Sequence, residues 1–525
     1  MRSKQIFIDV LLGILLPLTV AFIALRKVLI TPGLVLYGDL GFPYYLSDWL
    51  YYVSYAWNHY SSSPNGPISY INVLMFAIPH WLGASAEVSE KMWLFSSYAL
   101  AGIFMYFAMR ILLPKKGSIA HHGACIIASM AYMVNMYALV LIHLPGHLIS
   151  YAALPLTSAF YIKTLREKEN ILRNSFLTSI FLSLTVLATH TLAITLFAMA
   201  VFWLFRFRVK EGRILQDVKK NIIIAVSFLL INLYWTLPQY LAPVLPEAYF
   251  PSYVPPLRYD PAELGVERFG QGYDLLRVLS LNIGYGLFLP STLESKVIGT
   301  LIPIIAFSSL LIHKNDEIRR LVLPHSLLFL SASLVTIRSW PFTLASDFLG
   351  KYLFSSGLWW GFIRNPAHFA PLLIYSLAFL AGTSTLGILT RIHEPIEKLI
   401  LASLLPRESV KFIRANQLLS AALITFLITS PFIISSGYPA SGDVRGALTP
   451  IMIPEEYSRV NDWLRQREGL YRTWWIPQPI GHMRFSWAPE NPRTYAWPHV
   501  VASKPILWSS TDKSRFLLEY LYIQG

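Results

Sequence analysis

The chain has 525 residues, of which 54% are hydrophobic and only 14% are charged, and its mean hydropathy is +0.49. A soluble protein of this length needs far more charge to cover its surface, so the composition predicts a membrane protein. The 43 lysines and arginines outnumber the 29 acidic residues, which gives a formal net charge of +14. The single cysteine, Cys125, lies in an apolar stretch and excludes internal disulfides and thiolate metal sites.

Apolar segments recur along most of the chain at lengths that suit membrane helices, which need about 20 apolar residues. We therefore predict an all-α polytopic membrane protein with about 11 transmembrane helices. The predicted spans are residues 6–29, 92–113, 121–142, 146–163, 174–190, 191–207, 221–242, 297–313, 321–339, 367–390 and 418–437.

The connections that follow every second predicted span are basic. They are residues 114–116, 163–173, 206–220, 313–320 and 391–414. Because positively charged loops stay in the cytoplasm, we place these connections and the N-terminus, with Arg2 and Lys4, inside, and the C-terminal region outside. The same asymmetry accounts for most of the positive net charge, and no basic stripe suited to a nucleic acid backbone occurs.

This topology leaves three large outer segments, residues 30–91, 243–296 and 340–366. The first combines aromatic and polar residues, Trp49 among them, in a pattern typical of helices that lie in the membrane interface. It also holds a short apolar stretch, residues 68–82, which we predict to be a re-entrant or interfacial helix.

We divide the chain into a transmembrane domain, residues 1–437, and a small outer soluble region, residues 438–525. In the soluble region the sequence predicts a helix near 455–468, followed by extended, aromatic-rich segments with some β structure. It is small for an independent domain, which suggests that it is truncated or depends on packing against the membrane domain for its stability.

No P-loop, dinucleotide-binding, zinc-protease or paired-cysteine motif occurs in the sequence, which argues against an ATP-driven pump. A secondary transporter is expected to bury ionisable residues at mid-membrane depth. Here the candidate residues cluster instead at the outer ends of the predicted spans. This distribution favours catalysis at the outer interface over transport through the core.

Asp39 follows the first predicted span in a loop bounded by glycine and proline, residues 37–43. If the substrate is a sugar on a polyprenyl phosphate, a carboxylate must take the proton of the acceptor hydroxyl. A cationic group must also hold the charge of the leaving phosphate. We predict that Asp39 is this base and that Arg364, at the start of the tenth span, binds the phosphate. The alternatives are a solvated turn residue and an interfacial anchor.

Histidines accompany these two residues at the predicted outer face. His143, His147 and His190 fall in neighbouring outer turns and could bind phosphate or a divalent metal, although ordinary interfacial histidines would look the same. His368 follows Arg364 by four residues, so the two could share one face of a helix. We assign His190 and His368 to substrate binding.

Three further residues complete the predicted substrate site: Trp49, Glu263 and Glu267. The two glutamates lie in the second large outer loop and could supply a second carboxylate or metal ligands, with Mg or Mn as the metal. The alternative is that they are merely solvated, as most charges in such loops are. Asp48 fits a helix-face residue better than a catalytic one, and Arg338 is a weaker phosphate ligand than Arg364.

Short segments spread over most of the chain resemble a known family. They are Trp93 with the apolar run to Arg110, Ala131-Tyr132 followed by residues 146–155, and residues 234–238, 362–369, 471–477 and 485–487. Together with the acidic first outer loop, they are similar to the GT-C superfamily of polytopic membrane glycosyltransferases. More specifically, they resemble the N-terminal membrane part of the arabinofuranosyltransferase D type (alpha-(1->3)-arabinofuranosyltransferase-like). The distinctive segment is Arg364-Asn365-Pro366.

The resemblance implies a polyprenyl-phosphate sugar donor and a base in the first outer loop, and that base falls on Asp39. It also implies a carboxylate in the later outer loop, where Asp260, Glu263 and Glu267 all remain open. Chains of this family continue into large carbohydrate-binding modules, whereas this sequence ends at Gly525, so acceptor binding through such modules stays open.

The expected function is therefore transfer of a sugar from a polyprenyl-phosphate donor to a glycan, glycolipid or glycoprotein acceptor. We expect a multi-pass protein of the cell membrane that acts at the outer face in polysaccharide biosynthesis of the cell envelope, with no nucleic acid partner. One alternative is a flippase or transporter of lipid-linked oligosaccharides. The other is a non-catalytic membrane assembly protein that binds through residues 438–525.

Overall fold

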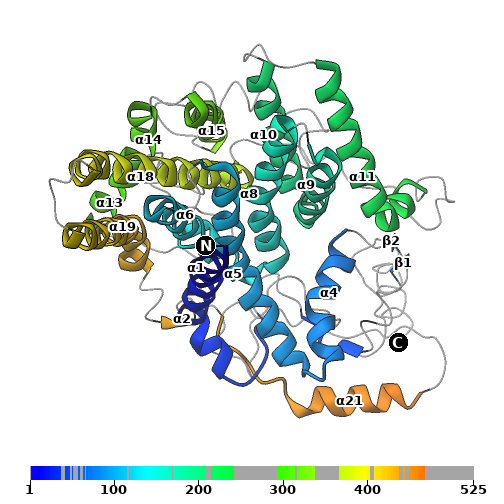
Figure 1. Cartoon of the computed structure of the whole chain (residues 1–525). Helices are drawn as coiled ribbons and strands as arrows, with labels where there is room; N and C mark the ends of the chain where they lie inside the picture. Colours follow the sequence, from blue (N-terminus) through cyan, green and yellow to red (C-terminus); the bar gives the residue numbers. More distant parts are fainter. Residues whose placement is uncertain are drawn as a thin grey trace. The chain divides into compact units, whose positions relative to one another are not determined.

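The computed structural model describes residues 2–36, 42–47, 50, 57–58, 63–64, 67–114, 118–167, 169–207, 214–241, 293–313, 316–336, 366–401, 407–436, 441–443 and 448–467. These residues are mostly helical (Figure 1). The α-helices are α1 (Arg2–Val10), α2 (Leu16–Ile30), α4 (Pro67–Trp81), α5 (Ala86–Leu112), α6 (Ile119–Met133), α7 (Met136–Val140), α8 (Pro145–Arg166), α9 (Ile171–Thr185), α10 (Thr189–Phe207), α11 (Ile214–Leu241), α13 (Leu293–Gly299), α14 (Leu301–Ile312), α15 (Asp316–Thr336), α18 (Ala370–Leu401), α19 (Arg407–Ser436) and α21 (Glu455–Arg465). Between them lie a π-helix η1 (Leu11–Leu15), the 3-10 helices η2 (Leu141–His143) and η6 (Pro366–Phe369), and the short strands β1 (Trp57–Asn58) and β2 (Ser63–Pro64).

The chain divides into two compact units. Unit 1 comprises Met1–Ala24, Ser96–Ile231 and Arg258–Ala440, and unit 2 comprises Leu25–Phe95, Asn232–Leu257 and Ser441–Gly525. This division differs from the predicted boundary at residue 437, because unit 2 combines the early outer segment with the last part of the chain. The predicted boundary separates the membrane part from the solvent part, whereas the two units are defined by how the residues pack together. The boundary at residue 437 therefore stays a prediction.

Local sequence signals set several of the helix ends in unit 1. The side chain of Ser118 accepts a hydrogen bond from the His121 amide and caps the start of α6. Asn135 does the same for α7 by accepting from Ala138. Pro145 opens α8, a position where its missing N–H costs nothing. These signals place short breaks between α6, α7 and α8.

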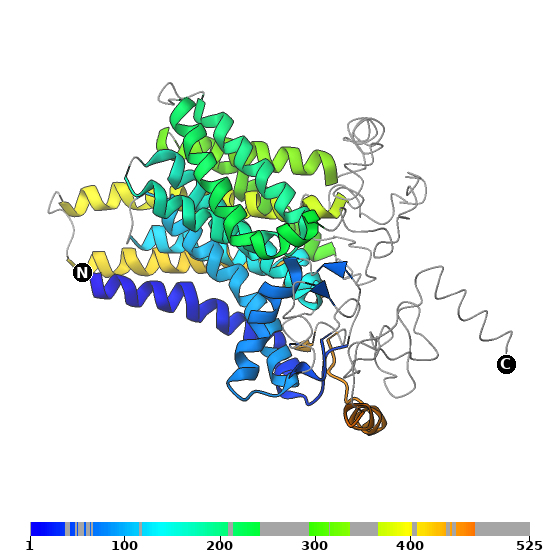
Figure 2. The ribbon, with the colours of Figure 1, turned by 90° about the vertical axis from the view of Figure 1, so that its right-hand side faces the viewer.

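Helix α18 is the centre of unit 1. It packs against α6, α14, α15 and α19, which surround it in Figure 1. Figure 2 shows that the axes of α18, α19 and α1 are nearly parallel. The approach of α18 to α6 depends on a glycine, because a Cβ atom at Gly382 would lie 2.8 Å from the carbonyl oxygen of Ala124 and 2.9 Å from the Cβ of Ala128. Small residues therefore allow the two backbones to pack closely, as is common between membrane helices.

All eleven ranges predicted as spans contain helix among the described residues. By length and composition, however, three described segments could cross a membrane, Gln5–Ile30, Ala86–Leu112 and Ala370–Arg391, and the bent pair of α6 with residues 136–143 could be a fourth. Others are apolar but short, such as Ile171–Thr185 and Val297–Ile312. The described part of the chain is thus mostly helical and holds segments that are long and apolar enough to cross a membrane, and the number eleven stays a prediction.

Unit 2 holds the start of the first predicted outer segment beside residues that follow α19. Leu34 and Ile451 pair in an antiparallel bridge, with N···O distances of 3.0 and 2.8 Å. Gly33 precedes this bridge with φ of 109°, and a Cβ there would lie 2.6 Å from the backbone of Ile451, so only glycine fits. The ammonium group of Lys27 adds an ion pair with Asp443 at 3.2 Å.

Two predicted helices of unit 2 are confirmed. The apolar stretch 68–82 forms α4, and the helix expected near 455–468 forms α21. The β structure predicted after this helix lies outside the described residues.

Candidate substrate site

The structure describes two of the residues that the sequence assigns to the site, His190 and His368. The others lie outside the described residues: Asp39, Trp49, Glu263, Glu267 and Arg364, together with Asp48, Asp260 and Arg338. The geometry of the candidate site therefore comes from the two histidines and from the described residues next to Asp39 and Arg364 in the chain.

His190 and His368 stack on each other. Their ring centroids lie 3.9 Å apart and the ring planes differ by 11°. The ring of His147 also stacks on that of His190, with the ring centroids 5.3 Å apart and an angle of 19° between the ring planes. Thus His147, His190 and His368, which we call the histidine stack, come together although the sequence separates them widely. His190 is buried, whereas His147 and His368 are half-buried.

Three helix starts place the histidine stack at one end of unit 1. His147 is in the first turn of α8, His190 is the second residue of α10, and His368 is in η6, which leads directly into α18. Arg364 precedes Pro366, the first residue of η6, by only two residues. The stack is therefore next in the chain to the arginine that we predict to bind phosphate.

His143, which the sequence groups with these histidines, has no described ring contact with the stack. It ends η2 and is 1% exposed.

Stacked tyrosines join α8, which carries His147, to α6. The rings of Tyr132 and Tyr151 stack at 4.0 Å, and each hydroxyl donates to the other residue's carbonyl oxygen. The amide of Asn135 donates to the Tyr151 hydroxyl at 3.1 Å. All three side chains are buried, so these bonds fix α8 against the break between α6 and α7.

The loop that carries Asp39 is anchored at its N-terminal side in unit 2. Glu90, which is fully buried, accepts a hydrogen bond of 2.8 Å from the Val35 amide. The neighbouring Lys91 donates to the carbonyl oxygen of Thr31 and pairs with Glu87 at 2.6 Å. These contacts fix the backbone two and six residues before the loop begins at residue 37.

Aromatic packing anchors the same loop at its C-terminal side. Phe42 is fully buried, and its ring lies 5.1 Å from that of Phe76 and 6.0 Å from that of Trp93. Leu36, on the other side of the loop, is also fully buried. Asp39 is therefore no more than three residues from a buried anchor in either direction. Sequence reasoning missed Glu90 and Phe42, because nothing local shows that their partners are near.

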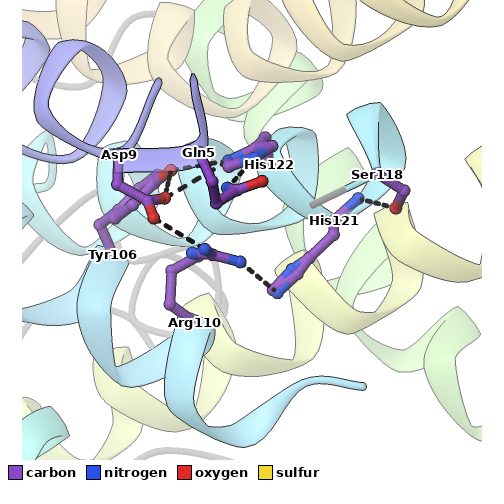
Figure 3. Close-up of polar contacts among 7 residues, drawn as sticks. All are labelled: Gln5, Asp9, Tyr106, Arg110, Ser118, His121 and His122. Atoms are coloured by element: carbon purple, nitrogen blue, oxygen red, sulfur yellow. Dashed lines mark hydrogen bonds and ion pairs between the residues drawn. The ribbon is translucent and has the colours of Figure 1, made fainter. Parts of the chain in front are cut away.

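A second polar cluster lies in unit 1, where α1, α5 and α6 meet (Figure 3). Arg110 pairs with Asp9 at 2.7 Å, and the Tyr106 hydroxyl donates to the same carboxylate at 3.1 Å. His122 bridges the Tyr106 hydroxyl and the Gln5 amide, each at 2.8 Å. The cluster lies at helix ends that the sequence places inside, and it satisfies buried charge, so we assign it a structural role.

The described residues do not fit a metal. They hold no group of three or more histidine, cysteine, aspartate or glutamate side chains that could bind an ion. In the histidine stack, parallel rings 3.9 Å apart present faces to each other instead of converging nitrogens. A metal that bound here would need ligands beyond the described residues.

Two solved structures share the fold of the chain. No protein family model and no curated protein sequence matches it. The structure of arabinofuranosyltransferase AftD from Mycobacteria matches 96% of this chain with a TM-score of 0.59 and 14% sequence identity. A mutant form of the same enzyme matches 96% with a TM-score of 0.55 and 13% identity. An oligosaccharyltransferase, AglB from Archaeoglobus fulgidus, matches 86% at 13% identity, but its TM-score of 0.30 is too low to compare folds.

The chain spans about a third of the length of the arabinofuranosyltransferase, namely 31% of one structure and 33% of the other. The match to that third of the enzyme includes 96% of the residues of this chain. The chain therefore has the fold of part of a mycobacterial arabinofuranosyltransferase, as the resemblance in sequence predicted.

Proposed function

We propose that the chain is a membrane glycosyltransferase of the GT-C type, which transfers a sugar from a polyprenyl-phosphate donor to a glycan, glycolipid or glycoprotein acceptor. The observation that carries this proposal is the match of 96% of the chain to an arabinofuranosyltransferase fold. The described helices long and apolar enough to cross a membrane agree with a donor that has a lipid tail.

In the proposed reaction, the oxygen of an acceptor hydroxyl attacks the anomeric carbon of the sugar. The bond between that carbon and the phosphate oxygen breaks, and the phosphate leaves with the electron pair. Asp39 takes the proton of the attacking hydroxyl, which is the role of a general base. The negative charge on the leaving phosphate needs hydrogen-bond donors that are already in place.

We assign the phosphate to Arg364 and to the histidine stack. The support is that His368 is four residues from Arg364 in the chain and stacks on His190. Imidazole N–H groups donate to phosphate oxygens, and the stacked rings keep each other in place. The anchors around residues 34–36 and 42 support Asp39 as a base, because a base must be held at a fixed position to reach its proton.

The test is a transfer assay with the purified chain in lipid nanodiscs and a polyprenyl-phosphate sugar, beginning with arabinofuranose because of the fold match. Asp39→Asn should lower the rate by about 100-fold or more, since general bases contribute 10²–10⁴-fold. Asp48→Asn, nine residues further on, is the matched control and should keep its rate. Equal loss in both variants, or no loss in Asp39→Asn, would remove Asp39 from the site.

A further inference from the structure

A second candidate binding site lies within unit 1, in a pocket between α8, α10 and α15. The pocket has a volume of about 390 Å³, which falls in the range of small-ligand sites. Its charged lining includes three arginines, Arg166, Arg206 and Arg320, with the carboxylates of Asp316 and Glu317. None of these residues belongs to the proposed transferase site.

The pocket is charged at one end and apolar at the other. Arg166 and Arg206 are in the last turns of α8 and α10, and Arg320 is in the second turn of α15. One turn further along each helix, toward its middle, the lining is apolar, with Ile162, Phe202 and Pro324. The direct chain neighbours of the arginines, Leu165, Phe205 and Leu321, add further apolar lining. A ligand that fills this pocket must combine an anionic head with an apolar chain.

The three guanidinium groups line the same pocket. Burial lowers the pKa of Arg166; among its charged neighbours Glu317 acts most strongly and raises this pKa, whereas Arg206 and Arg320 lower it further. Arg206 has Asp217 as an ion-pair partner at 3.9 Å, but its buried Nε donates no hydrogen bond within the part of the chain that the structure describes. Bringing three cations together costs free energy that a bound anion would recover.

The carboxylates of the lining offset part of this attraction, but two acidic residues against three arginines leave one net positive charge in the lining. Asp316 and Glu317 are exposed in the first turn of α15, where acidic side chains stabilise a helix, so water screens their charge. Arg166 and Arg206 are only partly exposed and are therefore screened less.

The pocket and the histidine stack lie at opposite ends of the same two helices. His147 and Arg166 are at the two ends of α8, whose 22 residues span about 33 Å at 1.5 Å per residue. The topology predicted from the sequence places the connections that follow these two helices, residues 163–173 and 206–220, inside. In that topology the pocket is at the cytoplasmic ends of α8 and α10, about 30 Å along α8 from the histidine stack.

We propose that this pocket binds the phosphate of an anionic membrane lipid, with the guanidinium groups of Arg166, Arg206 and Arg320 on the phosphate and the apolar lining on the acyl chain. Basic pockets between membrane helices on the cytoplasmic side are suited to such headgroups. Because the site is about 30 Å along α8 from the histidine stack, its ligand is distinct from the proposed sugar donor, and the inference does not depend on the proposed function.

The test is native mass spectrometry of the full chain, released from non-ionic detergent, with phosphatidylglycerol, phosphatidylcholine or inorganic phosphate added. We expect phosphatidylglycerol to bind and phosphatidylcholine to bind at least tenfold more weakly. Arg166→Gln and Arg320→Gln should each weaken phosphatidylglycerol binding about five- to tenfold, as expected for one arginine near a lipid phosphate. Arg320 is exposed, so its variant should fold even if the Arg166 variant does not.

Arg319→Gln is the matched control, because Arg319 is an exposed neighbour of Arg320 that does not line the pocket. It should bind phosphatidylglycerol like the unaltered chain. Equal loss in the Arg319 and Arg320 variants would show general surface attraction and overturn the proposal. Equal binding of the two lipids would also overturn it. Displacement of the lipid by inorganic phosphate at the lipid's own affinity would make the ligand a free anion and refute the lipid assignment.

Discussion

Replacement of Glu90 by alanine tests the anchor that holds the backbone before Asp39. The carboxylate of Glu90 accepts the Val35 N–H at 2.8 Å and is fully buried, so water cannot take its place. A hydrogen bond contributes about 0.5–1.5 kcal/mol net, and an unsatisfied buried N–H costs about 1–3 kcal/mol. Burying the carboxylate itself costs free energy, which the substitution recovers. We therefore expect Glu90→Ala to lower the free energy of unfolding by about 2 kcal/mol.

Glu90→Gln separates the hydrogen bond from the charge. Glutamine keeps an acceptor for the Val35 amide and fills the same volume, so its free energy of unfolding should stay within about 1 kcal/mol of that of the unaltered chain. Unfolding by sodium dodecyl sulfate titration from mixed micelles, followed by circular dichroism, measures both variants.

The same pair of variants links the anchor to function. If Asp39 is the base, Glu90→Ala should lower the transfer rate at a temperature where the variant remains folded, and Glu90→Gln should largely retain it. The reasoning is refuted if Glu90→Ala is as stable as the unaltered chain, or if glutamine destabilises as much as alanine.

Three other predictions concern unit 1. Arg110→Met leaves the largely buried carboxylate of Asp9 without its ion pair and should lower the free energy of unfolding by about 2–3 kcal/mol. Adding Asp9→Asn should restore part of this loss; a loss in the double variant equal to the sum of the two single-variant losses would show that the ion pair contributes nothing. Gly382→Leu forces a side chain against the carbonyl oxygen of Ala124 and should cost about 1–3 kcal/mol or prevent folding, whereas unaltered stability would contradict the close helix contact. His368→Phe keeps an aromatic ring in the stack but loses its N–H groups, so the KM for the lipid donor should rise about tenfold with stability unchanged; an unaltered KM would remove His368 from the phosphate site.

The helical fold was predictable because it depends on local sequence. Long apolar runs predicted the positions of the helices, and α4 and α21 were expected from short patterns within their own residues. The sequence predicted one continuous helix over residues 121–142, but the Asn135 cap begins a separate helix, α7, within that range. The number of spans was harder to predict, since apolar helices of 10–17 residues can cross, enter or lie beneath a membrane with the same composition.

The candidate site was predictable only in part, because its contacts join distant parts of the chain. The sequence named His190 and His368 separately, but their stacking depends on how η6 meets the start of α10. The bond between Glu90 and Val35 joins residues 55 positions apart, and the pair of Asp9 with Arg110 joins residues 101 apart. No periodicity or motif shows such pairs, so they were missed.

The most direct measurement of the central claim is a cryo-electron microscopy structure of the chain in lipid nanodiscs with a non-hydrolysable polyprenyl-phosphate sugar. A glycosyltransferase of the proposed kind should hold the phosphate within hydrogen-bond distance of Arg364 or of the imidazoles of His190 and His368. The sugar should face Asp39. Binding of the donor elsewhere, for example only in the pocket of Arg166, Arg206 and Arg320, would contradict the proposed catalytic site.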